Sequence, residues 1–434
     1  MTAVRRPELL SPAGTLKNMR YALAYGADAV YAGLPRYSLR VRNNDFHAEN
    51  LQKGIDEAHA AGRRFYVACN LMPHGAKLAT FIDDLAPVID AGPDALIMAD
   101  PGLIMLARER WPEMPIHLSV QANTVNAAAV RFWQQVGLSR VILSRELSLD
   151  EVQAIREACP DMELEVFVHG ALCIAYSGRC LLSGYFNHRD ANQGTCTNAC
   201  RWDYRVGEGT EVADEAIGGR QRHPAADGIY YLEEKGRPGE FMPIFEDEHG
   251  TYILNSRDLR AVEHVHRLVA MGIDCLKIEG RTKSHYYAAR ATQVYRRAID
   301  AAVAGEPFDP GLMADLEGLA NRGYTDGFLQ RHESSELQSY RQGASATDRQ
   351  QFVGEVAGFD IDRGLALVDV KNKFAVGDTL ELLTPAGNHR FTLGRMQDEE
   401  GQPMDEAPGG GYRVAIPLPA AAHEMALITR IMAE

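Results

Sequence analysis

The chain has 434 residues, of which 46% are hydrophobic and 24% charged, and its formal net charge is −14 at pH 7. These values are typical of globular proteins, and they exclude fibrous, disordered and membrane-embedded chains. We therefore expect two or three domains in a cytoplasmic protein with no membrane partner, because no signal-peptide core and no run of roughly 20 apolar residues occurs.

The first 170 residues repeat a short apolar run, an amphipathic helical stretch and a glycine turn. The runs are continuous rather than alternating, which is typical of parallel strands covered on both faces. Helices are predicted over Asn50–Ala61, Leu149–Cys159 and Ala261–Met271, among others. Eight runs are predicted to be strands: Glu8–Leu10, Ala29–Ala32, Phe65–Ala68, Ala95–Met98, Ile116–Val120, Val141–Ser144, Leu164–Val168 and Cys275–Ile278.

Eight β/α units are the number that closes a barrel. An open, doubly wound sheet is the alternative, but it usually carries a glycine-rich phosphate turn after its first strand. Here that turn reads Ser11-Pro-Ala-Gly14, which is not a dinucleotide fingerprint. We therefore predict an α/β fold with a TIM-like (β/α)8 barrel over residues 1–332.

An insertion separates the seventh and eighth predicted strands. It contains a cysteine-bearing segment, 172–206, and a stretch rich in glycine and charge, 207–249, which we predict to be a flexible insert. After the polar segment Glu333–Arg349, short strand-like runs recur without helices. They predict a small all-β domain, a barrel or a sandwich, over residues 350–434.

Four of the seven cysteines follow a C-x6-C-x15-C-x3-C pattern: Cys173, Cys180, Cys196 and Cys200. In a large chain without a secretion signal, such a group indicates metal or redox chemistry rather than disulfides. Thiolates bind both zinc and iron–sulfur centres. The wide gaps and the absence of a C-x2-C pair favour a 4Fe-4S cluster, with zinc as the alternative. The alternative is four unrelated cysteines that bind no metal. Free cysteines are usually buried among apolar residues, however, and the segment that carries these four is polar.

The other three cysteines are predicted to be packing residues. Cys159 ends a helix and Cys275 opens an apolar strand. Cys69 lies beside the predicted rim of the barrel. The alternative to packing is therefore that Cys69 replaces one of the four clustered cysteines as a metal ligand.

In a (β/α)8 barrel the active site lies at the C-terminal ends of the strands. Ten polar residues directly follow predicted strands: Asn70, Asp100, Gln121, Asn123, Arg145, Glu146, His169, Glu279, Arg281 and Lys283. Any one of them could line the rim without a catalytic role, but their concentration indicates a site. We predict His169, Glu279 and Asn123 to be catalytic. His169, four residues before the first cysteine, would be a general acid/base or a hydrogen-bonding group.

Basic residues gather after the second and eighth predicted strands, which flank the first strand in a closed barrel. Seven residues are predicted to bind substrate: Arg36, Arg40, Arg42, Gln121, Arg145, Arg281 and Lys283. Arginines with nearby aromatic residues suit RNA phosphates and unpaired bases. They also suit a small dicarboxylate, and solvated surface arginines are the alternative without a ligand.

Three segments carry a resemblance to a known family: Glu165-Val-Phe-Val-His-Gly-Ala-Leu-Cys173, Ser177-Gly-Arg-Cys180-Leu-Leu-Ser183 and Asn192-Gln-Gly-Thr-Cys196-Thr-Asn-Ala-Cys200-Arg-Trp202. They resemble the signature of the collagenase-like peptidase family U32, in particular its tRNA-hydroxylating branch. The resemblance implies 5-hydroxylation of the wobble uridine of tRNA by a prephenate-dependent, oxygen-independent route with a cysteine-held 4Fe-4S cluster. It also implies three kinds of partner: the tRNA anticodon loop, prephenate or a related small acid, and an iron–sulfur or electron-donor protein.

Proteolysis is an alternative that the residues fit poorly. A peptidase needs an activated nucleophile or a metal-bound water with a base, and the chain has neither a G-x-S-x-G nor an H-E-x-x-H motif. A third hypothesis is a zinc-stabilised, tRNA-binding scaffold protein whose chemistry is done by a partner.

Overall fold

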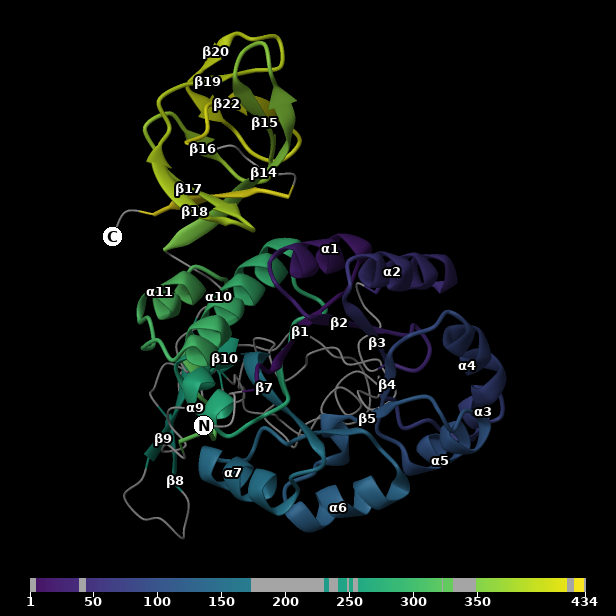
Figure 1. The fold of residues 1–434 in the computed structure, drawn as a ribbon. Helices are drawn as coiled ribbons and strands as arrows, with labels where there is room; N and C mark the ends of the chain where they lie inside the picture. Colours follow the sequence, from purple (N-terminus) through teal and green to yellow (C-terminus); the bar gives the residue numbers. More distant parts are fainter. Residues whose placement is uncertain are drawn as a thin grey trace, which may run out of the picture.

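A computed structural model describes residues 5–38, 44–172, 257–321, 323–330, 349–419 and 425–432, and the backbone of three strands between 230 and 252. Eight parallel strands close a barrel in the order β12-β1-β2-β3-β4-β5-β6-β7, with β7 paired to β12 (Figure 1). The predicted barrel is thereby confirmed. Its strands are β1 Glu8–Pro12, β2 Ala29–Gly33, β3 Arg64–Cys69, β4 Ala95–Met98, β5 Ile116–Leu118, β6 Arg140–Ile142, β7 Glu163–Ala171 and β12 Cys275–Ile278.

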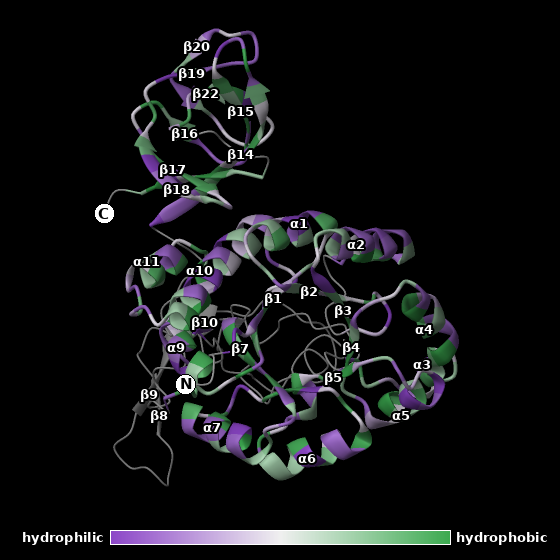
Figure 2. Ribbon diagram, viewed as in Figure 1, coloured by the Kyte–Doolittle hydropathy of each residue, from purple (hydrophilic) through white to green (hydrophobic). Residues whose placement is uncertain are grey.

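Helices surround the barrel (Figure 1) and carry both hydrophilic and hydrophobic residues along their length (Figure 2). Their starts follow the sequence: Asp100 accepts a hydrogen bond from the Leu103 amide, and Ser148 forms a capping box with Glu151. None of the described helices is long and apolar enough to cross a membrane. The helices are α1 Leu16–Ala24, α2 Ala48–Ala60, α3 Gly75–Leu78, α4 Phe81–Asp90, α5 Pro101–Arg110, α6 Ala127–Val136, α7 Leu149–Ala158, α9 Val265–Ala270, α10 His285–Ala304 and α11 Gly311–Glu317.

Short elements depart from the predictions. The helix predicted over Ala261–Met271 begins with a 3-10 turn, Val262–His264, and the Ala261 amide before this turn donates to the Val168 carbonyl of β7. β11 (Asp258–Arg260) extends the sheet antiparallel to the end of β7, and β13 (Tyr324–Thr325) pairs with β11. Part of the predicted flexible insert, 207–249, forms a three-stranded antiparallel sheet with the residues that follow it; the strands are β8 Tyr230–Glu233, β9 Phe241–Asp247 and β10 Gly250–Tyr252.

The C-terminal part of the chain is all β, as predicted. Eight of its strands form one antiparallel sheet in the order β18-β17-β23-β14-β15-β22-β19-β20, around a core that includes Val353, Phe374 and Leu382. A further pair, β16 and β21, lies beside it. The strands are β14 Gln350–Asp360, β15 Leu365–Val370, β16 Phe374–Ala375, β17 Thr379–Thr384, β18 Gly387–Thr392, β19 Met396–Gln397, β20 Pro403–Met404, β21 Glu406–Ala407, β22 Arg413–Ile416 and β23 Leu427–Ile431.

Helices α1 and α10 hold this domain against the barrel. Arg290 of α10 is completely buried and donates to Glu381 on β17 and, at 3.4 Å, to Gln350. From α1, the Tyr25 hydroxyl donates to the Leu383 carbonyl at 2.9 Å. Since a buried charge is costly unless it is paired, the Arg290–Glu381 pair fixes the domain in one position.

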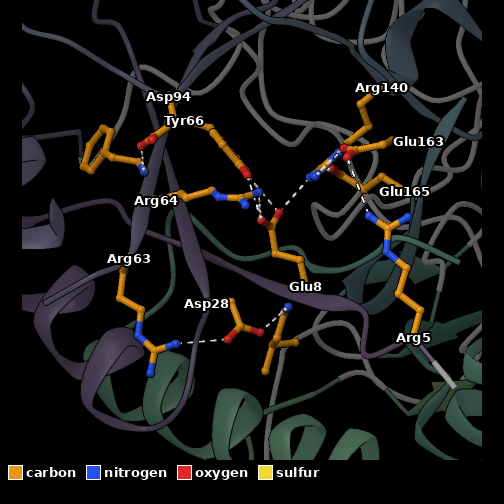
Figure 3. Close-up of polar contacts among 12 residues, drawn as sticks. Arg5, Glu8, Asp28, Arg63, Arg64, Tyr66, Asp94, Arg140, Glu163 and Glu165 are labelled. Atoms are coloured by element: carbon orange, nitrogen blue, oxygen red, sulfur yellow. Dashed lines mark hydrogen bonds and ion pairs between the residues drawn. The ribbon is translucent and has the colours of Figure 1, made fainter. Parts of the chain in front are cut away.

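The N-terminal ends of the barrel strands, here called the base, hold a network of buried charges (Figure 3). Arg140 lies 2.7 Å from Glu8, 2.8 Å from Glu163 and 3.3 Å from Glu165, and its side chain is only 2% exposed. Deeper in the barrel, Lys277 donates to the other oxygen of Glu165 at 2.8 Å. Each buried charge therefore has at least one opposite charge in contact, as its burial requires.

The base network predicts that two arginines that bind the same glutamate contribute unequally to the free energy of unfolding. Arg140→Met would leave Glu165 with Lys277 as its remaining cation and Glu8 with the exposed Arg64, so we expect a loss of about 3 kcal/mol in the free energy of unfolding. Arg64 also contacts Glu8, at 3.0 Å, but its side chain is 60% exposed, so Arg64→Met should cost less than about 1 kcal/mol. Urea denaturation followed by tryptophan fluorescence measures both. Equal losses of unfolding free energy in the two variants would contradict the assignment of Arg140 as the buried partner of Glu8 and Arg64 as its exposed partner.

Candidate active site

The C-terminal ends of the barrel strands, with the residues that directly follow them, form what is here called the mouth. The ten polar residues predicted for the rim are all described, and most of them lie at the mouth as expected from the strand ends. Asp100 is the N-cap of α5, so its place is explained by a structural role. Six of the predicted site residues lie outside the described residues: Arg40, Arg42, Cys173, Cys180, Cys196 and Cys200.

Glu279, directly after β12, is the centre of a polar chain across the mouth. Its Oε2 accepts a hydrogen bond from the Tyr31 hydroxyl at 3.0 Å and lies 4.0 Å from Arg145 Nη2. Arg145 stacks on the Phe167 ring, 3.8 Å from its centroid, and donates to the Ala171 carbonyl at 3.2 Å. Burial, followed by the nearby Glu279 charge, raises the pKa of Tyr31 well above its usual value, so the phenol stays a proton donor.

Positive charge surrounds the Tyr31 ring. The Lys277 ammonium lies 4.4 Å from the ring centroid, and the Arg281 guanidinium lies 5.8 Å from it. Arg281 is buried and donates to the Ser38 hydroxyl at 2.6 Å. Lys277 is paired with Glu165, so within the group around Tyr31 two further cations, Arg145 and Arg281, stand beside the one carboxylate of Glu279.

The predicted substrate residue Arg36 is placed differently. Its guanidinium pairs with Asp84 of α4 at 2.7 Å, and its side chain is half-exposed. Asp84 also accepts a hydrogen bond from the Tyr37 hydroxyl. The structure therefore gives Arg36 a helix-anchoring contact and does not bring it to the group around Tyr31.

His169 is buried in β7 among three tyrosine rings. The ring centroids of Tyr287, Tyr295 and Tyr324 lie 5.5–5.7 Å from the imidazole. The Tyr295 hydroxyl gives its proton to the Val168 carbonyl at 2.6 Å, so toward His169 Nδ1, 3.4 Å away, it is an acceptor. This favours a proton on Nδ1 and a bare acceptor at Nε2, which is buried and has no partner within the described residues.

Burial is the main reason why the pKa of His169 falls to about 3, and the positive charges of Lys283 and Arg260 lower it further. The imidazole is therefore neutral at physiological pH. Of the two roles predicted for His169, hydrogen bonding suits this neutral ring better than donation of a proton from an imidazolium.

Asn123 combines backbone strain with a buried acceptor. The strand predicted over Ile116–Val120 ends at Leu118, and a 3-10 turn, Val120–Ala122, follows it. Asn123 then adopts a left-handed conformation with φ of 49°, and its Nδ2 donates to the Gln121 carbonyl at 3.0 Å. Its Oδ1 is buried with no partner among the described residues. Strain and an unpaired acceptor together are a mark of functional sites.

Some mouth residues were missed by the sequence analysis. Tyr31 and Lys277 lie within runs predicted simply as buried strands, although a lysine inside the apolar run Cys275–Ile278 was a usable signal. Tyr287 and Tyr295 lie on α10, far from His169 in sequence. No local pattern indicates which of the tyrosines on this helix turn toward the barrel.

The three described cysteines are buried, as predicted for packing residues. Burial raises the pKa of the Cys69 and Cys275 thiols, so both remain protonated at neutral pH. The cysteine-bearing segment begins at the mouth, because β7 ends at Ala171 and Leu172 directly precedes Cys173.

Comparisons with known proteins match both parts of the chain. The model of peptidase family U32 matches residues 14–339, and that of the peptidase family U32 C-terminal domain matches residues 348–430. The tRNA hydroxylation protein P of Escherichia coli (strain K12) is 65% identical over 95% of this chain and 94% of its own length. The protein of the same name from Haemophilus influenzae is 59% identical, over 96% and 95%. A collagenase of Porphyromonas gingivalis is 27% identical, over 95% and 94%.

The low pKa of His169 predicts a pH-dependent stability. The unfolded chain binds a proton at this histidine below its ordinary pKa of about 6.5, whereas the folded chain does so only near pH 3. The folded state is thus not penalised for the neutral His169 above about pH 6.5, and the free energy of unfolding decreases as the pH falls below that value. We expect His169→Gln to reduce the stability loss between pH 7 and pH 5 by about 2 kcal/mol. Urea denaturation at pH 5, 6 and 7 measures it, with His47→Gln, an exposed histidine, as the control. An unchanged pH dependence in His169→Gln would refute the buried neutral ring.

Proposed function

The chain belongs to peptidase family U32, and we propose that it hydroxylates tRNA rather than cleaving peptides. The observation that carries the proposal is 65% identity along nearly the whole chain to a protein named for tRNA hydroxylation, against 27% for a collagenase. The mouth supports the same choice. Among the described residues, the side chain that hydrogen-bonds His169 is Tyr295, and no described serine or cysteine is paired with it as a nucleophile.

The finer proposal is that the substrate atom is C5 of the wobble uridine in the anticodon loop, and that the protein acts in the cytoplasm. A uracil base in the mouth has one N–H donor, N3, which suits a bare acceptor such as His169 Nε2 or Asn123 Oδ1. Gln121 and Asn123 would bind the base edge, and Lys283 would contact the RNA backbone. Glu279 would remain an acceptor held between Tyr31 and Arg145.

The proposal includes prephenate as co-substrate. Exchange of the C5 hydrogen for a hydroxyl removes two electrons from the base, so the co-substrate would both deliver the oxygen atom and accept the two electrons, its C–OH becoming C–H as the base C–H becomes C–OH. Prephenate carries two carboxylates, and the proposal is that Arg145 and Arg281 would bind them through paired N–H donors, as guanidinium groups do.

The four clustered cysteines would hold the redox centre. When bound by Cys173, Cys180, Cys196 and Cys200, a 4Fe-4S cluster would supply one-electron transfer to this site. Four thiolates fit such a cluster, and β7 leads directly from His169 to the first of them. Zinc remains the alternative metal, but it has no redox chemistry and so does not suit a hydroxylase. An iron–sulfur or electron-donor protein would then serve as the partner that brings the cluster to its active oxidation state, and it would supply no net electrons to the oxidation of the base.

The proposal predicts a specific loss from cellular tRNA. In a strain that lacks this gene and any oxygen-dependent parallel pathway, nucleoside mass spectrometry should show 5-hydroxyuridine derivatives falling to background. Wild-type protein should restore them. Cys180→Ser should not, and the purified variant should contain less iron than wild type.

The matched control is Cys159→Ser, which changes a buried packing cysteine outside the cluster. It should restore most of the modification. Normal levels of 5-hydroxyuridine derivatives in the deletion strain would refute the proposed function, and full activity of a colourless, zinc-loaded protein would refute the cluster.

A further inference from the structure

A pocket of 420 Å³ lies where the barrel meets the C-terminal domain, here called the junction pocket. Its walls come from the loop before α10, the start of α10, the chain after α11 and β14. Six residues define it for the argument: Lys283, Tyr286, Leu319, Gln351, Phe352 and Met432.

The junction pocket shares a wall with the mouth. Tyr287 lines the pocket, while its hydroxyl donates to the Glu279 carbonyl at 2.8 Å and its ring lies 5.7 Å from His169. Lys283 also belongs to both, with its ammonium 5.4 Å from the Tyr287 ring centroid. Tyr287 and Lys283 are therefore the side chains that lie between the pocket and the residues of the mouth.

The lining has three kinds of group. Tyr286 and the half-buried Phe352 are stacked parallel, with centroids 5.0 Å apart and an interplanar angle of 4°, and the His285 ring meets Phe352 edge-on at a centroid distance of 5.5 Å. Leu319 and Met432 add apolar surface, whereas Lys283 and Gln351 supply a cation and an amide. An aromatic surface beside an amide and a cation matches an unstacked nucleotide, which presents a π-face, base-edge hydrogen bonds and a phosphate. A purely aliphatic ligand would leave the cation and amide unused.

The pocket is built before any ligand arrives. Its two halves are tied by the buried Arg290, which binds Glu381 and Gln350 of the C-terminal domain from the same helix that carries Tyr286. Lys17 of α1 adds an ion pair with Glu355 on β14 at 2.6 Å. A preformed pocket binds without the cost of ordering its walls.

We propose that the junction pocket holds one unstacked nucleotide adjacent to the target uridine, by stacking its base on Phe352. This rests on the proposed function, because it takes RNA to be the substrate at the mouth. It gives the C-terminal domain a direct part in substrate binding, and it makes recognition depend on a neighbouring base as well as on the uridine itself.

The test is a cycle of protein and RNA changes, measured as equilibrium binding at one fixed salt concentration. The RNA is an anticodon stem-loop with a wobble uridine, either intact or with one abasic residue at each flanking position in turn. For wild-type protein, one abasic position should weaken binding about 5- to 150-fold, as expected for loss of one base–aromatic stack. For Phe352→Leu, the abasic residue at that same position should weaken binding less than about threefold. This weakening by an abasic residue is here called the penalty.

Two further variants keep the test decisive. Phe359→Leu changes an exposed phenylalanine on the same strand, outside the pocket, and should retain the wild-type penalty. Gln351→Ala, at a half-exposed position, should reduce the penalty at least twofold even if Phe352→Leu folds poorly.

Equal penalties in wild type, Phe352→Leu and Gln351→Ala at every flanking position would overturn the junction pocket proposal while leaving tRNA binding intact. Failure of the wild-type protein to bind the intact stem-loop would overturn the proposed function as well, so the two failures are distinguishable.

Discussion

The carboxylate of Glu165 is completely buried inside the barrel, between Arg140 and Lys277, and both ends of the barrel depend on it. Barrels of this kind are usually filled by layers of branched apolar side chains. Here a column of alternating charges runs from the base through Glu165 and Lys277 to the ring of Tyr31. Removal of Glu165 would leave Lys277 without its opposite charge in the core, and an unpaired buried charge is strongly destabilising. The column therefore fixes both the packing of the barrel and the positive charge at its mouth.

The two ends use their charges differently. At the base, arginines and carboxylates pair with one another around a cavity of 330 Å³, and this pairing is sufficient to explain their presence. At the mouth, Asn123 Oδ1 and His169 Nε2 are buried acceptors without partners among the described residues. Unpaired buried groups of this kind cost stability, and they are retained where a ligand satisfies them. One such group, His117 Nδ1, also lies beside Tyr66 near the base, so the paired arginines and carboxylates there, rather than the absence of unpaired groups, are what indicate a structural role for the base.

Patterns within single elements were predictable from the sequence, whereas contacts between elements were not. The eight barrel strands follow from continuous apolar runs, and Glu279 and His169 follow from the rule that polar residues after such strands meet at one end. Strands of two or three residues, such as β11 and β13, carry no detectable period. The orientation of Arg36 toward Asp84 and the pairing of Arg290 with Glu381, 91 residues away, depend on tertiary packing. So does the tautomer of His169, which is set by a tyrosine from α10.

One measurement tests the central claim most directly. Protein purified without oxygen and loaded with iron is incubated with prephenate and a stem-loop RNA carrying the wobble uridine, and the mass of the RNA is then determined. The account predicts a gain of one oxygen atom on that uridine, and no gain when either prephenate or the iron centre is omitted. An iron-loaded protein that binds the stem-loop but leaves its mass unchanged in the presence of prephenate would contradict the account.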